Sequence, residues 1–557
     1  MRSIPIIKLL LVMALLPCTI ASFAQPKVDK IKVKVRMSAD QEADARMMPY
    51  SIIQSDGNSI MMMRSGEFDV RAFGKLTARL DLYDRAKLTY VRSQEPVMRG
   101  KGREKLLLED LVLFGGKLML IARYNGEAEV ALYSQTIDPN LTKPPPNFER
   151  FCTFPVELKE FKPLVVSAGS AMRSPFNVTI SRDSTHMLVY SPEVRDAESD
   201  AAMYLIALLD RNMNVVWQHI LRVSENAHRS RLIDVELDDA GNAYVLVRND
   251  FKGRDFIDGK PNFEVVLYRL SEGDIANAPF TLDPGYWPTG GVLEPLSGGR
   301  MACAGIYASS EEQRFKLLGN YVTVFEAGSA EMGAPKLMPF TAGSGLEDEG
   351  APEEDDEEKP KEDDSTKQEK KDEKRMSSAT DIIATVPRSD GGFFVVNEVS
   401  YARVSRNTQT GSSSTTYYHG PVQVRSFSKD GVELWSTIYR RWTASGSPLL
   451  GRVFPAEFND QIFLFMLDSD EMIERRKAGD KITPKHGREP YSVYVSFDEK
   501  GAYRTKAVLK SDTNKDYIGG WNLMRTGKGE YIALGTEKLV SGKFLPVKIE
   551  FTIETKK

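Results

Sequence analysis

The chain has 557 residues, 27% of them charged, and a formal net charge of −4 at pH 7. Proteins that bind nucleic acid concentrate basic residues on one face, and this near-balance of charge argues against that class of partner. After the N-terminal segment, no stretch approaches the ~20 apolar residues that a membrane-spanning helix requires.

The N-terminus has the pattern of a secretory signal peptide. A positively charged start is followed by a short apolar run, Leu9 to Leu16, and by the small residues Ser22 and Ala24 at the −3 and −1 positions of a cleavage site. We expect cleavage after Ala24 and export. Lipid attachment at Cys18 is the alternative, although Pro17 stands where lipoprotein signals favour a small residue.

Two cysteines remain in the mature chain, Cys152 and Cys303. Two are too few for a disulfide framework in an exported chain of this length. We expect two buried free thiols, with a single bridge as the alternative. Stability must then come from a large apolar core.

A strand–turn–strand pattern recurs along the mature chain. Its clearest copy runs from Leu232 to Asn249, where two alternating apolar segments flank a tight turn. Similar turns fall near positions 56, 115, 183, 241, 298, 390, 459 and 527. The spacing is regular, roughly sixty residues, except where Glu347 to Arg375 interrupts it. We expect this charged insertion to be a disordered loop, because it has almost no apolar residues.

Each unit contains a second pair of strands. Val422 to Phe427 and Glu433 to Tyr439, for example, flank a turn at Lys429-Asp430-Gly431. Four antiparallel strands per unit are the signature of a β-propeller blade. We therefore predict one all-β domain over residues 25–557, an eight-bladed β-propeller, with a seven-bladed ring as the alternative. No helix of useful length is expected after the signal peptide.

The last unit lacks its fourth strand. Three strands, Ile518 to Arg525, Tyr531 to Thr536 and Leu545 to Ile553, bring the chain to its end. At the other end, Lys30 to Met37 alternates strictly between charged and apolar residues. A ring of blades must hide its free edges or close on itself, so we predict that this N-terminal strand completes the last blade.

Two short elements resemble known propeller repeats. Asp239 to Val245 resembles the D-x-x-G-N-x-Y-V element of secreted bacterial β-propeller repeats, and Asp430 to Trp435 resembles the D-G-x-x-L-W element of quinoprotein-type propellers. The resemblance implies a propeller of the quinoprotein-like or WD-repeat-like kind, and export. It implies no catalytic residue, because fold alone does not fix function.

The predicted blades place the connections on two faces. The short-turn face carries the turns between strands one and two and between strands three and four. The long-loop face carries the connections between strands two and three and between blades, and most of the long segments fall there. Loops on a rigid scaffold are the usual place for binding, so the candidates are taken from this face.

Three segments of the long-loop face carry the predicted ligand-binding residues. Asn397 to Pro421 combines arginines with aromatic residues that suit recognition. Phe251 to Phe263 and the segment after Pro284-Gly285 are the other two, and the residues selected from all three are Arg403, Arg406, Tyr417, Tyr418, His419, Arg254, Asp255 and Trp287. The alternative for the first segment is an extended hairpin whose aromatic residues pack on their own blade. Trp217 and Trp435 are expected to pack between blades.

No catalytic motif stands out. The five histidines form no H-E-x-x-H pair, and neither a G-x-S-x-G elbow nor a phosphate loop is present. Acids such as Asp234 or Glu236 could converge in the central channel, where three or more clustered ionisable groups would favour an enzyme. No metal or other cofactor is expected.

The sequence thus predicts an exported, monomeric binding or assembly module without a bound nucleic acid or a transmembrane segment. Its location would be the periplasm or the surface of a Gram-negative bacterium, and its partner a protein or a glycan. The alternative is an enzyme with a site over the channel, such as a quinone-dependent dehydrogenase, a hydrolase or a lyase.

Overall fold

The computed structural model describes residues 30–39, 47–54, 57–66, 78–96, 106–157, 176–223, 227–253, 256–257, 260–311, 314–341, 346, 379–406, 413–446, 450–480, 482, 489–509, 516–537 and 544–554. The expected signal peptide and the charged insertion lie outside these residues. No helix among them is long and apolar enough to cross a membrane.

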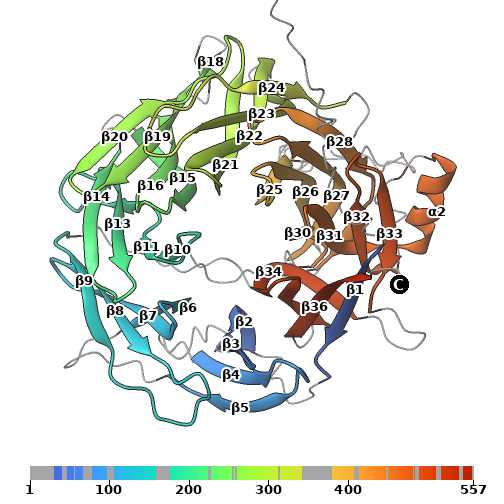
Figure 1. The fold of residues 1–557 in the computed structure, drawn as a ribbon. Helices are drawn as coiled ribbons and strands as arrows, with labels where there is room; N and C mark the ends of the chain where they lie inside the picture. The colour runs from blue at the N-terminus through green and yellow to red at the C-terminus, as the bar shows by residue number, and fades with distance from the viewer. Residues whose placement is uncertain are drawn as a thin grey trace, which may run out of the picture.

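Eight antiparallel sheets stand around a central axis like the blades of a propeller (Figure 1). The eight-bladed prediction is confirmed, as is the order of strands within each blade. Blades one to four consist of β2 (Met47–Gln54), β3 (Ser59–Gly66), β4 (Ala78–Asp84) and β5 (Tyr90–Gln94); β6 (Leu107–Phe114), β7 (Lys117–Asn125), β8 (Val130–Thr136) and β9 (Glu149–Phe154); β10 (Asn177–Ile180), β11 (His186–Tyr190), β13 (Ala202–Asp210) and β14 (Val215–Arg222), with β12 (Val194–Arg195); and β15 (Ala227–Leu237), β16 (Ala243–Phe251), β19 (Phe263–Ser271) and β20 (Asp274–Pro279).

Blades five to eight continue the pattern, and a small ribbon of β17 (Phe256–Ile257) and β18 (Lys260–Pro261) belongs to blade four. The remaining blades consist of β21 (Trp287–Leu296), β22 (Arg300–Glu311), β23 (Arg314–Glu326) and β24 (Lys336–Pro339); β25 (Ala379–Pro387), β26 (Phe393–Arg406), β27 (Ser413–Phe427) and β28 (Glu433–Tyr439), with β29 (Thr443–Ser445); β30 (Phe454–Phe458), β31 (Gln461–Asp468), β32 (Tyr491–Phe497) and β33 (Tyr503–Ala507); and β34 (Tyr517–Gly527), β35 (Glu530–Thr536), β36 (Phe544–Glu554) and β1 (Lys30–Met37).

The N-terminal strand closes the ring as predicted. β1 pairs along its whole length with β36, from Lys30 opposite Glu554 to Met37 opposite Val547. Its apolar side chains, Ile31, Val33, Val35 and Met37, pack on the core shared by blades seven and eight. The last blade is therefore completed by residues from the opposite end of the chain.

The core lies between the blades, because each sheet packs both faces against its neighbours. Trp217 of blade three is only 6% exposed and donates its indole N–H to the carbonyl of Gly241 in blade four. Trp435 of blade six stacks on Phe497 of blade seven. Both tryptophans thus pack between blades, as expected. Cys152 and Cys303 are buried free thiols, also as expected.

One expectation about secondary structure is wrong. A nine-residue helix, α2 (Asp470–Ala478), follows β31 on the outside of blade seven. Ser469 caps its N-terminus by accepting the N–H of Met472, and Gly479 ends it at a positive φ of 78°. The apolar periodicity is weak because Met472 is the only buried residue of the helix; the two caps define it instead.

Candidate functional site

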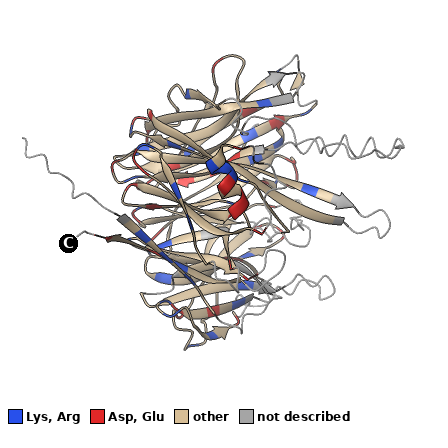
Figure 2. Ribbon diagram, turned by 90° about the vertical axis from the view of Figure 1, so that its right-hand side faces the viewer, with Lys and Arg blue, Asp and Glu red and all other residues tan. Residues whose placement is uncertain are grey.

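Two blades extend far beyond the others on the long-loop face. β22 and β23 of blade five have 12 and 13 residues, and β26 and β27 of blade six have 14 and 15. In Figure 2 the C-terminus lies on the left, and long hairpins reach out on the opposite side of the disc. The segment between Asn397 and Pro421 is therefore mainly strand, which corrects the expectation of a loop and matches the extended-hairpin alternative.

The outer part of the β26–β27 hairpin, residues 400–406 and 413–419, is here called the blade-six arm. The pairing of β25 with β26 reaches no farther than Ala379 opposite Ser400. Beyond that point β26 pairs with β27 alone, Tyr401 with Tyr418 and Arg403 with Thr416. The short strand β29 supports the other edge of β27 near the base of the arm, with Tyr417 opposite Ser445. The arm is thus a ribbon held at its base by a third strand.

An aromatic cluster lies at the base of the arm. The rings of Tyr401 and Tyr418 stack with centroids 4.8 Å apart and planes inclined by 14°. Trp442 meets Tyr401 edge-on at 6.0 Å. A Cβ atom at Gly420 would lie 2.8 Å from the Trp442 ring, so only glycine allows the ring to lie this close to the arm backbone. All three aromatic side chains are half-buried, so each keeps an accessible part.

A buried ion pair lies beneath the aromatic cluster. Glu398 on β26 accepts from the guanidinium of Arg441 and, at 3.1 Å, from the N–H of Val453 in blade seven. Arg441 also donates to the carbonyls of Leu467 (3.0 Å) and Gly451 (2.7 Å). Both ionised side chains are completely buried. The pair therefore ties blade six to blade seven directly under the arm.

His419 reinforces the charge of Glu398. Its Nδ1 atom lies 3.6 Å from a carboxylate oxygen of Glu398. Burial acts to raise the pKa of Glu398, but His419, Arg441 and Arg452 together hold that pKa below its ordinary value. Glu398 consequently remains ionised at neutral pH, as its role in the blade-to-blade contact requires.

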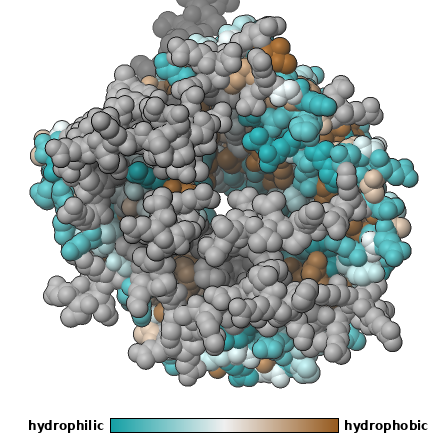
Figure 3. All heavy atoms as spheres, turned by 180° about the vertical axis from the view of Figure 1, so that it is seen from behind, coloured by the Kyte–Doolittle hydropathy of each residue, from teal (hydrophilic) through white to brown (hydrophobic). Residues whose placement is uncertain are grey.

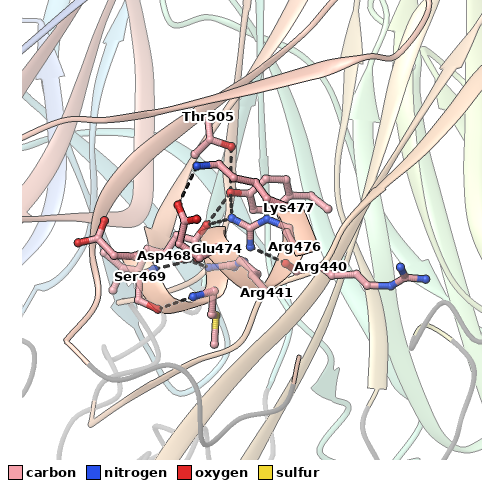
Figure 4. A network of polar contacts seen from close by, with 12 residues as sticks. Arg440, Arg441, Asp468, Ser469, Glu474, Arg476, Lys477 and Thr505 are labelled. Atoms are coloured by element: carbon pink, nitrogen blue, oxygen red, sulfur yellow. Dashed lines mark hydrogen bonds and ion pairs between the residues drawn. The ribbon is translucent and has the colours of Figure 1, made fainter. Parts of the chain in front are cut away.

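A second polar network holds α2 against blade six (Figure 4). Arg476 of the helix donates to Asp468, to the hydroxyl of Tyr439 (2.6 Å) and to the carbonyl of Arg440 (2.7 Å). Its guanidinium also lies over the Tyr439 ring, 4.1 Å from the centroid. Trp442, which contacts the arm, donates its backbone N–H to the sulfur of Met472 in α2. The arm and the helix are therefore parts of one supported surface.

The structure gathers one predicted group of residues on the blade-six arm. Arg403 is exposed on β26, and Tyr417 and Tyr418 are half-buried on β27, while His419 is 4% exposed beside Glu398. Arg406 is the last residue of β26, and its side chain lies outside the described part of the chain. Whether these residues bind a ligand stays a prediction.

The other predicted residues belong to blades four and five. Arg254 and Asp255 lie outside the described residues. Trp287 is the first residue of β21, the inner strand of blade five, and is half-buried. Its neighbour Tyr286 is 37% exposed and meets Tyr307 edge-on at 5.4 Å.

Sequence reasoning missed four residues of the aromatic cluster and the ion pair beneath it: Tyr401, Trp442, Glu398 and Arg441. Tyr401 lies within the predicted segment, and its pairing with Tyr418 follows once the segment is assigned as a hairpin. Arg441 pairs with a residue 43 positions away, and no local pattern marks such a contact.

Carboxyl groups converge in the channel, as anticipated for Asp234 and Glu236. Glu294 of β21 joins them, and Asp234 accepts the N–H of Leu293 at 2.7 Å across the blade boundary. Burial raises the pKa of Asp234 to about 6. Burial and the nearby Asp234 raise the pKa of Glu294 to about 8, and burial also raises that of Glu236. Within the described ranges, no three His, Cys, Asp or Glu side chains are grouped closely enough to hold a metal ion.

The inner strand of blade eight narrows the channel. Gly519 of β34 pairs with Leu534 of β35, and Met524 pairs with Ile532. An advance of five residues along β34 therefore corresponds to an advance of only two along β35. This is a large bulge, a feature common beside functional sites. Hollows of about 290 and 450 Å³ lie beside the bulge, the first bordered by Met524 and the second by Leu523.

Comparison with known proteins leaves the family open. No family model matches the chain, and no curated protein matches it. Among solved structures, the WD40 domain of SCAP from fission yeast is similar at 9% identity and a TM-score of 0.34, over 93% of this chain and 98% of that one. The polysaccharide lyase Uly1 shows 10% identity and a TM-score of 0.35 over 80% and 90%, and an ulvan lyase of family PL25 shows 11% and 0.34 over 92% and 94%. Likenesses this distant carry no argument about activity.

Proposed function

We propose that the protein is a β-propeller binding module that engages a partner protein through the blade-six arm, Trp442 and α2. The observation that carries this proposal is the aromatic cluster of Tyr401, Tyr418 and Trp442 at the base of a projecting ribbon. Tyrosine and tryptophan give large contact areas at low entropic cost, and both are enriched at protein interfaces.

Rigid support of the cluster strengthens the proposal. The buried Glu398–Arg441 pair lies beneath the arm, and Arg476 fixes α2 beside it. A surface ordered in advance loses little conformational entropy when a partner binds, so more of the contact energy appears as affinity. The exposed guanidinium-bearing Arg403 adds a residue type enriched at interfaces.

The proposal includes export and a monomeric propeller. The N-terminal pattern of the sequence supports delivery to the periplasm or the surface of a Gram-negative bacterium. Closure of the ring by β1 leaves no blade that needs a second copy for completion. A glycan is the rival partner, because aromatic surfaces suit both kinds of ligand, and the experiment must separate the two.

The test is capture of partners from an envelope fraction, followed by binding measurements with the purified partner. A double variant, Tyr401→Ala with Tyr418→Ala, should weaken binding at least tenfold, since aromatic anchors of interfaces contribute about 2 kcal/mol or more each. The matched control is Lys429→Glu with Lys500→Glu, two exposed residues in turns of the short-turn face. This control should bind like the wild type.

Two results would overturn the proposal. One is unchanged binding by the tyrosine variant with an unchanged melting temperature. The other is loss of binding in the short-turn control alone. If a glycan array gives arm-dependent binding and no protein is retained, the surface is assigned to a glycan instead.

A second candidate function is an enzyme with its site in the channel. The convergence of Asp234, Glu236 and Glu294, all with raised pKa values, favours it. A screen of polysaccharide and peptide substrates for hydrolysis or elimination tests this candidate. Any activity found must be lost in Glu294→Gln, and activity that survives this change excludes the three acids as its source.

A further inference from the structure

The smaller hollow of the channel lies among blades one, two, three and eight. It has a volume of about 290 Å³, near the lower end of small-molecule sites, and its wall includes Ile53, Asp110, Val178, Ile180, Met524 and Arg525. In Figure 3, which views the disc from behind, hydrophobic side chains are visible around the central opening where described residues form its wall.

Most of this wall is apolar and firmly supported. Ile53, Val178, Ile180 and Met524 are half-buried, and each packs on the core of its own region. One side of each is thus fixed by the fold while another borders the hollow. An apolar group placed there gains about 25 cal/mol for each Å² removed from water, and the wall needs no rearrangement.

The bulge in β34 forms the side of the hollow that blade eight contributes, opposite the inner strands of blades one to three. Because the strand leaves the ladder between Gly519 and Met524, Met524 and Arg525 approach the inner strands of blades one to three. The irregularity thus creates a small concave site in a fold whose other inner strands have no comparable slip of register among the described residues.

The hollow contains one carboxylate without a cationic partner. Asp110 accepts the N–H of Leu111 at 2.7 Å, and no Lys, Arg or His among the described residues forms an ion pair with it. Burial raises the pKa of Asp110 to about 6, with a further contribution from Glu109. At pH 7.5 most of the Asp110 carboxyl groups are nevertheless ionised, in surroundings that hydrate them poorly.

The one cation of the wall is already compensated. Arg525 lies 3.5 Å from Glu457 on the inner strand of blade seven, and about half of its side chain is exposed to water. The uncompensated charge of the hollow is therefore negative. Channel acids on blades four and five, Asp234 and Glu294, add to this negative potential when ionised, and a cleft lined by one sign of charge attracts ligands of the opposite sign.

We propose that this hollow binds the apolar end of a small organic ammonium ligand, with the ammonium group on the carboxylate of Asp110. The site is separate from the arm and does not depend on the function proposed for it. An anionic ligand would have to displace Glu457 from Arg525 and approach Asp110, so the arrangement disfavours it.

The test compares two probes of equal size, benzylammonium and benzyl alcohol, by ligand-observed NMR with the full mature chain at pH 7.5. Benzylammonium should bind at least tenfold more tightly than the alcohol, because a desolvated charge pair adds to the same apolar contact. Asp110→Asn should remove this difference and leave the alcohol unaffected. Ile180→Trp should fill the hollow and abolish binding of both probes.

The control is Asp234→Asn, which neutralises a channel acid outside the hollow that is mostly ionised at pH 7.5, and it should change benzylammonium binding less than twofold. Equal affinity of the two probes for the wild type overturns the proposal, as does failure of either probe to bind. Tight ammonium binding that persists in Asp110→Asn also overturns it. The comparison of probes on the wild type decides the question even if a variant does not fold.

Discussion

Three contacts between neighbouring blades differ in kind according to the face of the disc on which they lie. On the short-turn face, Asp239 accepts the N–H of Asp183 in the neighbouring blade at 3.0 Å, and Asp460 accepts the N–H and hydroxyl of Ser389 at 2.7 Å each. On the long-loop face, the completely buried Glu398–Arg441 pair of blade six contacts blade seven, because Glu398 accepts the N–H of Val453 and Arg441 donates to the carbonyl of Leu467.

The difference concerns what each contact leaves behind when it is broken. An exposed acceptor in a turn is replaced by water at little cost. A buried guanidinium that loses its carboxylate remains charged in surroundings that cannot hydrate it. We therefore expect the long-loop face, which carries the arm, to depend on a few costly contacts, and the short-turn face to depend on many small ones.

Removal of β1 should have the largest effect, because it opens the ring and affects both faces. Deleting residues 28–37 takes away four half-buried apolar side chains and a complete strand ladder. The free energy of unfolding should fall by about 5 kcal/mol, measured by guanidinium denaturation. Lys32→Ala with Lys34→Ala keeps the strand and alters only exposed positions, so it should remain within ~0.5 kcal/mol of the wild type. Equal stability of the deletion variant would contradict closure by β1.

The next largest effect is expected for the buried pair. Glu398→Ala leaves the charge of Arg441 uncompensated and should lower the free energy of unfolding by about 3–5 kcal/mol. Glu554→Ala is the control, because it breaks an exposed ion pair with Lys32 at 3.7 Å and should cost less than ~1 kcal/mol. If both variants lose the same stability, the two faces do not differ in the way described.

A substitution in the channel, in contrast, should raise the free energy of unfolding, and only at high pH. The pKa of Glu294 rises from an ordinary 4.5 to about 8 on folding, so the unfolded chain releases this proton more readily. Stability is then full below pH 4.5 and declines as the pH rises toward 8. Glu294→Gln removes this decline, so its stability relative to the wild type should rise by about 3–4 kcal/mol between pH 5 and pH 8.

Denaturation at the two pH values measures this difference. The matched control is the exposed Glu331→Gln, denatured at the same two pH values. A Glu294→Gln variant whose advantage is the same at pH 5 and pH 8 would show that packing, rather than titration, is responsible.

A smaller effect is expected at the helix on the long-loop face. Ser469→Ala removes the acceptor for the N–H of Met472 and should lower the free energy of unfolding by about 1 kcal/mol. Ser469→Asp keeps a capping oxygen and should retain most of the stability. Equal losses in the two variants would mean that the hydroxyl contributes through something other than the cap.

The features that could be predicted from the sequence lie mainly on the short-turn face. The short turns are specified by local residues, such as Gly241, whose φ of 83° favours glycine. Eight such turns at regular spacing were enough to predict the blades, and the missing last strand predicted closure by β1. Local chemistry determined these features, so the sequence displayed them.

The long-loop face could be predicted only in part. The helix α2 was not predicted, because a helix with one buried residue has almost no apolar periodicity. Arg441 pairs with Glu398, 43 positions away, and donates to Leu467 of blade seven, while Asp234 of blade four meets Glu294 of blade five. Such contacts depend on the angle between neighbouring blades, which no local pattern encodes.

The smallest effect should come from the turn at Asp239, within the hairpin whose pattern is clearest in the sequence. Asp239→Ala removes one exposed blade-to-blade hydrogen bond and should cost only about 0.5 kcal/mol, because water satisfies the freed N–H of Asp183. Asp239→Asn retains an acceptor and should match the wild type in denaturant titrations. A loss above ~2 kcal/mol in Asp239→Ala would mean that a single short-turn contact stabilises the packing of two blades about as much as a buried ion pair does. The proposed difference between the two faces would then be wrong.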